Sequence, residues 1–206
     1  VVGNKTVSGV GWFVWTEKAL DSLAFSGSLT NYGMFKLKDV TQTPQAGLSF
    51  QGGPSPGWQN NVQVQIDQNG KGNLIWLSNN AADEDRVEFD LGWTGGGDTI
   101  GWFALELTLD DLGTATPTVS ARVRDVDDSS EAYIGDWVDL GSITLANIFP
   151  GVSVVYQGFS IGDWGTWAWS GPFAWADRIN DPIPEPATLA LLALGGLTVL
   201  LCRRRA

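Results

Sequence analysis

Short runs in which apolar and polar residues alternate constrain the fold of this chain more than any other feature. Residues 62–67 alternate valine or isoleucine with glutamine or aspartate, and the same period of two recurs over 87–91, 103–109 and 119–123. Successive side chains of a β-strand point to opposite faces, so these runs predict strands with one buried face. Helical periodicity is scarce in the body of the chain, where only residues 16–23 favour one short helical turn.

Turn-forming residues separate these runs. Asn69-Gly70 follows the first run and precedes a partner run at 74–77, which is a strong signal for a β-hairpin. Two further short strands are predicted at 152–156 and 158–161. Segments rich in glycine, proline, aspartate and serine lie at 52–57, 95–98 and 127–130. Many short strands separated by turns predict an all-β fold, as an antiparallel β-sandwich or jelly roll.

Composition excludes several classes of function. The 206 residues include 12 Lys or Arg against 23 Asp or Glu, a net charge of −11, so the chain repels phosphates and is not expected to bind nucleic acid. It contains no histidine, which rules out Ser-His-Asp and Cys-His catalysis and histidine-ligated zinc. Its single cysteine cannot form a disulfide within the chain. The 26 glycines and 11 tryptophans are typical of an all-β surface protein.

The C-terminal end of the chain differs from its body. Ala187 to Cys202 is an uncharged run rich in leucine and alanine, and Arg203, Arg204 and Arg205 follow it. As a helix this run would be roughly 24 Å long, somewhat short of the ~30 Å hydrocarbon core of a bilayer. The run is apolar on all sides and ends in a positive cluster. We therefore favour a transmembrane helix with a cytoplasmic arginine-rich end over a helix buried in the core.

The predicted organisation is a sandwich domain over residues 1–180, an extended linker over 181–186, and a transmembrane helix with its arginine-rich end over 187–206. If the arginines stay cytoplasmic, the acidic domain lies across the membrane and needs an N-terminal export signal. The sequence begins at Val1 without a methionine. We expect either a mature chain whose signal peptide has been removed or a fragment of a longer protein.

Three features follow one another at the C-terminus: Pro184-Glu185-Pro186, the apolar run and the arginine cluster. This order resembles the PEP-CTERM protein-sorting domain of Gram-negative bacteria, over residues 183–206. The resemblance implies export, transient anchoring in the inner membrane and processing near the Pro-Glu-Pro by an exosortase. It also implies delivery to the cell surface or to an extracellular biofilm matrix that contains exopolysaccharide.

Aromatic residues are densest near the end of the sandwich domain and are candidates for glycan binding, because flat indole rings stack on the apolar faces of sugars. Trp167 and Trp169 have the i, i+2 spacing that places both on one face of a strand. Trp102 shares a strand face with Glu106, opposite the apolar residues of its run. The candidates are Trp164, Trp167, Trp169, Trp175 and Trp102. The alternative for each ring is simple core filling. The acidic composition favours a neutral polysaccharide as the ligand.

One acidic turn is a candidate metal site. Asp125, Asp127 and Asp128 supply hard oxygen ligands of the kind that Ca²⁺ prefers. The EF-hand spacing is only partly met, because Ser130 stands where the turn glycine is expected. An ordinary solvated turn is the alternative.

The best pair of residues for an enzyme is Glu88 and Asp90, which share one strand face about 7 Å apart by the strand rise. Paired carboxylates hydrolyse glycosides, and this run is similar to the Glu-x-Asp-x-(x)-Glu strand of jelly-roll glucanases. Gly92 and Trp93 stand where the last glutamate of that pattern, the proton donor, is expected. We therefore expect a polar strand face and no enzymatic activity.

Three hypotheses for the function remain. The first is a non-catalytic exported β-sandwich that binds exopolysaccharide or other glycans at the cell surface, and the second is a purely structural component of a matrix or surface layer. The third is a glycan-active hydrolase. Exposed tryptophans would favour the first over the second, and a cleft that holds Glu88 or Glu106 opposite a second carboxylate would favour the third.

Overall fold

A computed structural model describes residues 14–21, 27–37, 44–52, 61–77, 84–93, 101–112, 116–130, 132–145, 154–163 and 174–177. Every regular element within these ranges is a β-strand. The strands are β1 (Val14–Asp21), β2 (Gly27–Leu37), β3 (Pro44–Gly52), β4 (Asn61–Asp67), β5 (Lys71–Leu77), β6 (Glu84–Asp90), β7 (Trp102–Leu112), β8 (Thr118–Val126), β9 (Tyr133–Thr144), β10 (Val154–Asp163) and β11 (Ala174–Asp177).

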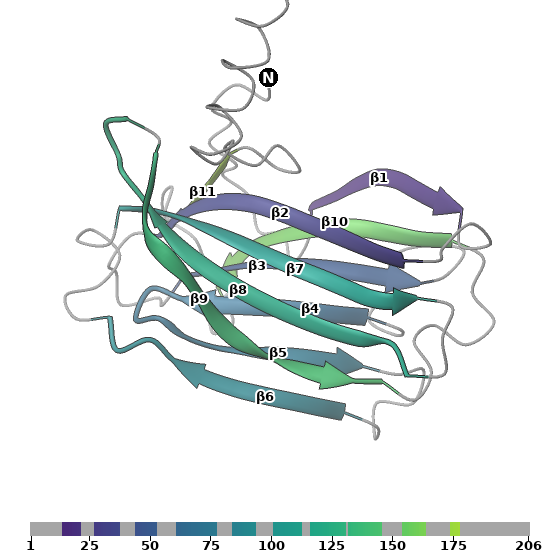
Figure 1. The fold of residues 1–206 in the computed structure, drawn as a ribbon. Helices are drawn as coiled ribbons and strands as arrows, with labels where there is room; N and C mark the ends of the chain where they lie inside the picture. Colours follow the sequence, from purple (N-terminus) through teal and green to yellow (C-terminus); the bar gives the residue numbers. More distant parts are fainter. Residues whose placement is uncertain are drawn as a thin grey trace, which may run out of the picture.

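The strands form two sheets that face each other (Figure 1). Sheet A has six strands in the order β1-β10-β3-β4-β5-β6, and sheet B has five in the order β11-β2-β7-β8-β9. All the strand pairs in both sheets are antiparallel. The predicted all-β antiparallel sandwich is therefore confirmed for the part of the chain that the structure describes.

Some of the predictions for individual segments are confirmed and others are wrong. The hairpin around Asn69-Gly70 is confirmed, because β4 and β5 pair across that turn and Gly70 has the positive φ of 76° that it needs. The helical turn predicted at 16–23 is wrong over residues 16–21, because these lie in β1, which pairs with β10. The two short strands predicted at 152–156 and 158–161 are wrong as separate elements, since β10 runs without interruption from Val154 to Asp163.

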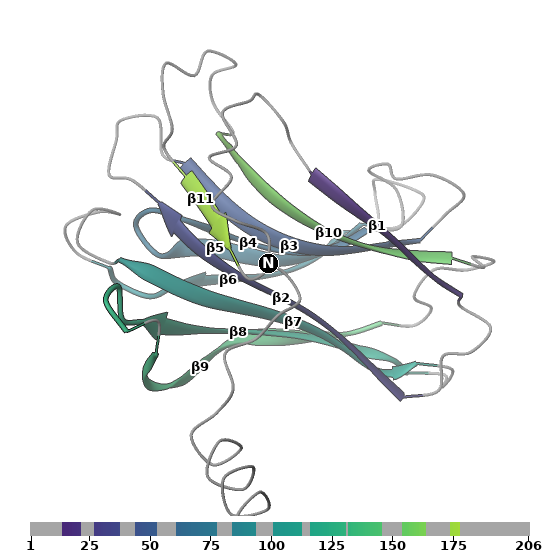
Figure 2. The ribbon, with the colours of Figure 1, turned by 90° about the horizontal axis from the view of Figure 1, so that it is seen from above.

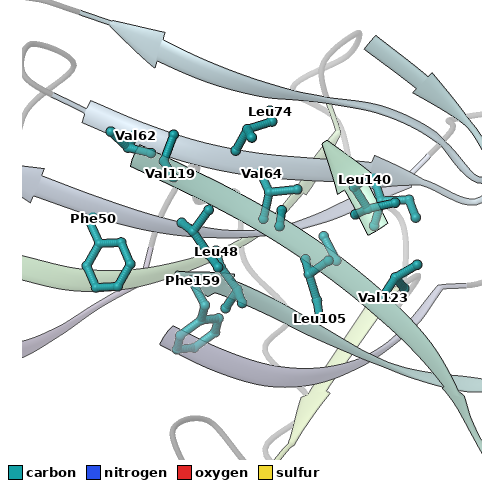
Figure 3. Packing of buried hydrophobic residues seen from close by; sticks show 14 of the residues in the cluster. Leu48, Phe50, Val62, Val64, Leu74, Leu105, Val119, Val123, Leu140 and Phe159 are labelled. Carbon is teal, nitrogen blue, oxygen red and sulfur yellow. The ribbon is translucent and has the colours of Figure 1, made fainter. Parts of the chain in front are cut away.

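The core lies between the two sheets and is built from the alternate positions of their strands. Val62, Val64 and Ile66 of β4 are fully buried, in one apolar cluster with Leu105, Leu107 and Leu109 of β7 from the other sheet. Figure 3 shows how residues from both sheets interdigitate in this cluster. Each fully buried Val, Leu, Ile or Phe side chain contributes about 1.5–3 kcal/mol relative to leaving it exposed, so this layer supplies the main driving force for folding.

One polar side chain lies inside the core and joins the two sheets. Asn31 of β2 is fully buried, and its Nδ2 donates hydrogen bonds to the backbone oxygens of Ser49 and Gly158, both at 2.9 Å. From the opposite sheet, the Gln157 side chain donates to the Thr30 backbone oxygen at 3.0 Å. These amides fix how the sheets are placed relative to each other, because a buried polar group that loses its partner costs about 1–3 kcal/mol.

The sheets are curved as well as packed. Figure 2 views the two layers edge-on and shows β3 and β10 bowed so that the outer face of sheet A is concave.

The linker predicted at 181–186 and the membrane helix predicted at Ala187 to Cys202 lie outside the described residues. Among the residues that are described, no helix is long and apolar enough to span a membrane.

Candidate functional site

The concave outer face of sheet A carries a layer of uncharged polar side chains. The register places Ser49 and Gln51 of β3 opposite Gln63 and Asn61 of β4, and Gln65 continues the row. These five residues, here called the amide layer, are between 0% and 7% exposed. Because a charged group is far more costly to bury than an amide, only uncharged polar residues are tolerated at these positions.

Some atoms of the amide layer have no hydrogen-bond partner within the described part of the chain. Asn61 donates from Nδ2 to the Gln63 side-chain oxygen at 3.2 Å, but its own Oδ1 is buried without a partner. The Oγ of Ser49 is likewise buried without a hydrogen-bond partner among the described residues. Buried polar atoms are almost always satisfied in native proteins, so these two atoms make the amide layer unusual.

A groove of about 480 Å³ opens beside this layer, where β3, β4, β5 and β6 end near the β4–β5 turn. Its lining is mostly polar: Gln45, Asp67, Lys71, Gly72, Asn73, Glu88, Phe89 and Asp90. These residues define the amide groove. The side-chain oxygens of Gln45 and Asn73 are buried there without a partner among the described residues.

The β4–β5 turn holds the groove residues in place. One carboxylate oxygen of Asp67 accepts the backbone N–H groups of Asn69 at 2.8 Å and Lys71 at 2.9 Å. This side-chain closure is the usual role of aspartate before an Asn-Gly turn. It sets the start of β5, so that Lys71 pairs with Asp90 in register and their side chains form an ion pair at 3.7 Å.

The predicted carboxylate pair lies at the edge of the amide groove. Glu88 and Asp90 are both exposed; Arg86 lies 4.0 Å from Glu88, and one oxygen of Asp90 accepts the Gly92 N–H at 2.9 Å. The two carboxylates come from one face of one edge strand, so they stand side by side on the same wall of the groove. The structure brings them together with amides and a lysine that belong to neighbouring strands.

The acidic turn does not gather its three carboxylates. Asp125 lies within β8, where it pairs with Phe103 of β7. Asp128 forms an ion pair with Lys36 at 2.7 Å and accepts the Trp102 N–H at 2.9 Å. Within the described residues, no group of three or more carboxylate, cysteine or histidine side chains is arranged to hold a metal. The structure therefore gives no support to the Ca²⁺ site predicted at this turn.

Asp127 instead closes the turn between β8 and β9. Its Oδ1 accepts hydrogen bonds from the hydroxyl and backbone N–H of Ser129, at 2.6 and 3.0 Å. The hydroxyl and N–H of Ser130 add two more at 2.9 and 2.7 Å. These bonds, the Ser129 hydroxyl first, hold the pKa of Asp127 well below its usual value.

Replacing Asp127 by asparagine is expected to lower the melting temperature of the protein at neutral pH. A carboxylate whose pKa is lower in the folded than in the unfolded state adds stability above about pH 4, and that stability is lost as the pH falls through the folded pKa. The difference in melting temperature between wild type and variant should therefore be smaller at pH 2 than at pH 7, as followed by circular dichroism. A difference that is the same at both pH values would contradict this account.

The tryptophan candidates are only partly placed. Trp164, Trp167 and Trp169 lie outside the described residues. Trp175 lies on β11, where it pairs with Lys36 of β2, and Lys36 pairs in turn with Trp102 of β7. Trp175 and Trp102 therefore occupy one row across sheet B.

Trp102 does lie on the outer face, as predicted, together with Glu106. Its ring is half-buried and packs against a second apolar cluster, which includes Tyr32, Met34, Ala104 and Val126. Because it packs against these side chains, the Trp102 ring is less available for stacking on a sugar than a fully exposed ring would be.

Most groove residues were not singled out from the sequence. Gln45 and Asn73 belong to strands that become neighbours of β4 and β6 only in the folded sheet. A signal for them does exist: the outward positions of β3 and β4 carry glycine, serine, glutamine and asparagine, and only Asp67, at the end of β4, is charged. A solvent-facing strand usually carries charges, as the outward positions of β6 do, so an uncharged polar face indicates burial.

The chain has also been compared with known proteins. Residues 182–205 match the family model of the PEP-CTERM protein-sorting motif. The C-terminal tail is a PEP-CTERM sorting motif. The match includes the Pro-Glu-Pro, the apolar run and the arginine cluster from which the resemblance was predicted. No curated protein sequence matches the chain.

Several solved structures share a general likeness with the chain. A glycoside hydrolase family 16 endo-glucanase from Bacteroides ovatus is 9% identical with a TM-score of 0.44, covering 80% of this chain and 72% of that one. The CBM40 of the Ruminococcus gnavus IT-sialidase, bound to α2,3-sialyllactose, is 12% identical with a TM-score of 0.38, covering 88% and 96%. Sheep galectin-11 is 11% identical with a TM-score of 0.36, covering 70% and 87%.

Proposed function

We propose that this chain is an exported, non-catalytic protein that binds a neutral polysaccharide at the cell surface or in the exopolysaccharide matrix of a Gram-negative bacterium. The inner membrane holds the precursor transiently through the PEP-CTERM tail until an exosortase processes it. The sorting motif at residues 182–205 supports this route. One observation carries the binding function: the amide groove on the concave face of sheet A, with its buried, unpartnered Gln45 and Asn73 oxygens.

The chemistry of the amide groove suits sugars. Each sugar hydroxyl both donates and accepts a hydrogen bond, and the groove offers amide oxygens, carboxylates and the Lys71 ammonium. Its volume of about 480 Å³ falls within the usual range for ligand sites. Three carboxylates against one lysine make the groove acidic, which disfavours an anionic polysaccharide.

Binding without cleavage is what we expect, because Gly92 and Trp93 stand where the proton-donor glutamate of the similar glucanase strand is expected. Of the three carboxylates in the groove, Glu88 and Asp90 stand on one wall, and Asp67 accepts the Asn69 and Lys71 N–H groups of its own turn. Glu88 and Asp90 are both exposed, and Asp90 is held by Lys71.

Replacing Gln45 and Asn73 together by alanine is expected to weaken polysaccharide binding about tenfold or more. Two lost hydrogen bonds at about 0.5–1.5 kcal/mol each account for this loss. Binding is measured by affinity electrophoresis in gels that contain a soluble β-glucan, a galactomannan or dextran, with alginate as the anionic comparison. Val138→Ala, a truncation of an exposed side chain on sheet B that lines no groove in the described part of the chain, is the control.

The outcomes separate the three hypotheses. Equal mobility of the wild type in all gels would reject glycan binding and favour a structural matrix component. Release of reducing ends by the wild type that disappears in Glu88→Gln would favour the hydrolase. Retention that falls in the double variant and persists in Val138→Ala supports the proposal, provided that both variants melt like the wild type.

A further inference from the structure

The outer face of sheet B is divided into two halves of different chemistry. Near the β8–β9 turn it is apolar and aromatic, with Tyr32, Met34, Trp102, Ala104, Val126, Tyr133 and Trp137 packed together. Toward the other end of the strands it carries hydroxyl groups at almost every outward position. These residues are Ser28, Thr30, Thr108, Thr118, Ser120, Ser142 and Thr144, and all of them are exposed or half-buried.

The hydroxyl half contains a second groove, of about 510 Å³. It lies over the middle of β8, between β7 and β9, and we call it the hydroxyl groove. Its lining is Glu106, Thr108, Asp110, Ser120, Ala121, Arg122, Asp139, Gly141 and Ser142. The register aligns Thr30, Thr108, Ser120 and Ser142 in one row across four neighbouring strands. Neighbouring strands are about 4.8 Å apart, so the row presents hydroxyls at regular intervals.

Part of this row is already engaged, and part is free to bind. The Thr30 and Thr108 hydroxyls lie 3.4 Å apart, and Ser28 donates to Asp110. Ser120 and Ser142 form no side-chain hydrogen bond with any residue that the structure describes. Both can therefore donate to and accept from a ligand in the groove.

Arg122 is held rigidly where the two halves meet. Its Nε and one terminal nitrogen donate to the two carboxylate oxygens of Glu106, at 2.8 and 3.1 Å. Its guanidinium also lies 4.5 Å from the centre of the Trp137 ring. A guanidinium has five donors, so those not bound to Glu106 are available in a fixed orientation, which lowers the entropic cost of binding a ligand.

The chemistry of the hydroxyl groove identifies the class of ligand. A protein partner would need an apolar or aromatic centre for its interface, and this half of the face has none among the described residues. Once Glu106 and Arg122 neutralise each other, Asp110 and Asp139 leave the groove acidic, which disfavours polyanions. Alternating hydroxyl donors and acceptors with one fixed guanidinium match a neutral sugar chain.

We propose that the hydroxyl groove is a second binding site for neutral polysaccharide, so that one copy of the protein cross-links two polysaccharide chains. This inference rests on the proposed function of the amide groove. The residues of the amide groove lie on sheet A and those of the hydroxyl groove on sheet B. The two sheets are the two layers of the sandwich (Figure 2), so grooves on their outer faces face away from each other and bind separate strands of polymer. A protein of this kind would link the polysaccharide chains of a matrix to one another, in addition to coating them.

The test compares binding with cross-linking for the full chain purified in mild detergent. Ser120→Lys with Ser142→Lys fills the hydroxyl groove, and Ser120→Thr with Ser142→Thr is the matched control that keeps both hydroxyls. Light scattering is followed while each protein is titrated into the neutral polysaccharide that retains the wild type most strongly. A bivalent binder gives scattering that rises and then falls with excess protein, because excess protein saturates single sites.

The expected result is that the lysine variant loses the rise in scattering, at least tenfold, but is still retained in the affinity gel. The threonine variant should behave like the wild type. Adding Gln45→Ala and Asn73→Ala to the lysine variant should abolish retention. Circular dichroism melting curves check that each variant is folded.

Two outcomes would overturn the inference, and they differ from failure of the proposed function. If a folded lysine variant still raises the scattering as much as the wild type does, the cross-linking does not depend on the hydroxyl groove. Loss of all retention in that variant would make the hydroxyl groove the single site. If the wild type binds no polysaccharide at all, the proposed function itself fails.

Discussion

Replacing Pro184, Glu185 and Pro186 together by alanine is expected to leave the protein as an uncleaved precursor in the inner membrane of a host that has an exosortase. Proline fixes φ and lacks a backbone donor, so we expect the two prolines to keep this stretch extended and open to a processing enzyme. Alanine favours helix, so the variant is expected to extend the predicted membrane helix through the cleavage region. An immunoblot of separated membrane, surface and medium fractions measures the effect.

The control for this change is Thr188→Ala, which leaves the Pro-Glu-Pro intact and adds no charge. It should mature like the wild type. Normal cleavage and release of the triple-alanine protein would show that recognition does not depend on this motif, and would remove the main support for the proposed route.

The largest effect on stability is expected from Gly72→Ala in β5. A Cβ at this position would lie 1.9 Å from the backbone oxygen of Gln65 and 2.6 Å from the ring of Phe89. Neither atom yields easily, because the oxygen belongs to the neighbouring strand β4 and the ring packs against the core. The free energy of unfolding should fall by about 3 kcal/mol, the upper end of the usual cost of overpacking, as measured by urea denaturation.

The matched control is Gly92→Asn. Gly92 has a positive φ of 64° and no neighbouring atom within 4 Å of an added Cβ, and asparagine tolerates that conformation better than other side chains. The control should therefore change the free energy of unfolding by less than about 1 kcal/mol. Equal losses in the two variants would mean that the crowding at Gly72 is relieved at no cost.

The sequence predicts best the strands whose alternation is clean. β4, β6, β7 and β8 show period-two alternation, β5 is the partner run after the Asn-Gly turn, and all five occur. The sequence does not predict β2 as a strand, because the expected alternation is broken. Asn31 occupies a core position, while Tyr32 and Met34 make the outer face apolar. In β9, register shifts and the glycines at 135 and 141 break the period.

The error at β1 has a different cause. Glu17, Lys18, Ala19 and Leu20 are good helix formers, and nothing in the local sequence opposes a helical turn. Pairing with β10 decides the conformation instead, with a register shift between Thr16 and Leu20. Strand formation depends on partners that are distant in sequence, and here the partner is more than a hundred residues away.

The candidate site shows the same limit. Glu88 and Asp90 could be predicted as neighbours, because the strand period alone places them on one face. Gln45 and Asn73 could not, because their proximity depends on the strand order of sheet A. The hydroxyl groove likewise requires the alignment of β7, β8 and β9, which sequence spacing does not provide.

The strand order also decides when the domain can fold. β10 inserts between β1 and β3, so sheet A is complete only when residue 163 is available, and β11 pairs with β2 at the edge of sheet B, so sheet B is complete only at residue 177. The sorting motif begins at residue 182, only a few residues later. Pairings between distant segments form slowly. Under the export route proposed above, the last strand of the sandwich emerges only shortly before the tail, so the final pairing of β11 with β2 is expected to be completed close to the bilayer.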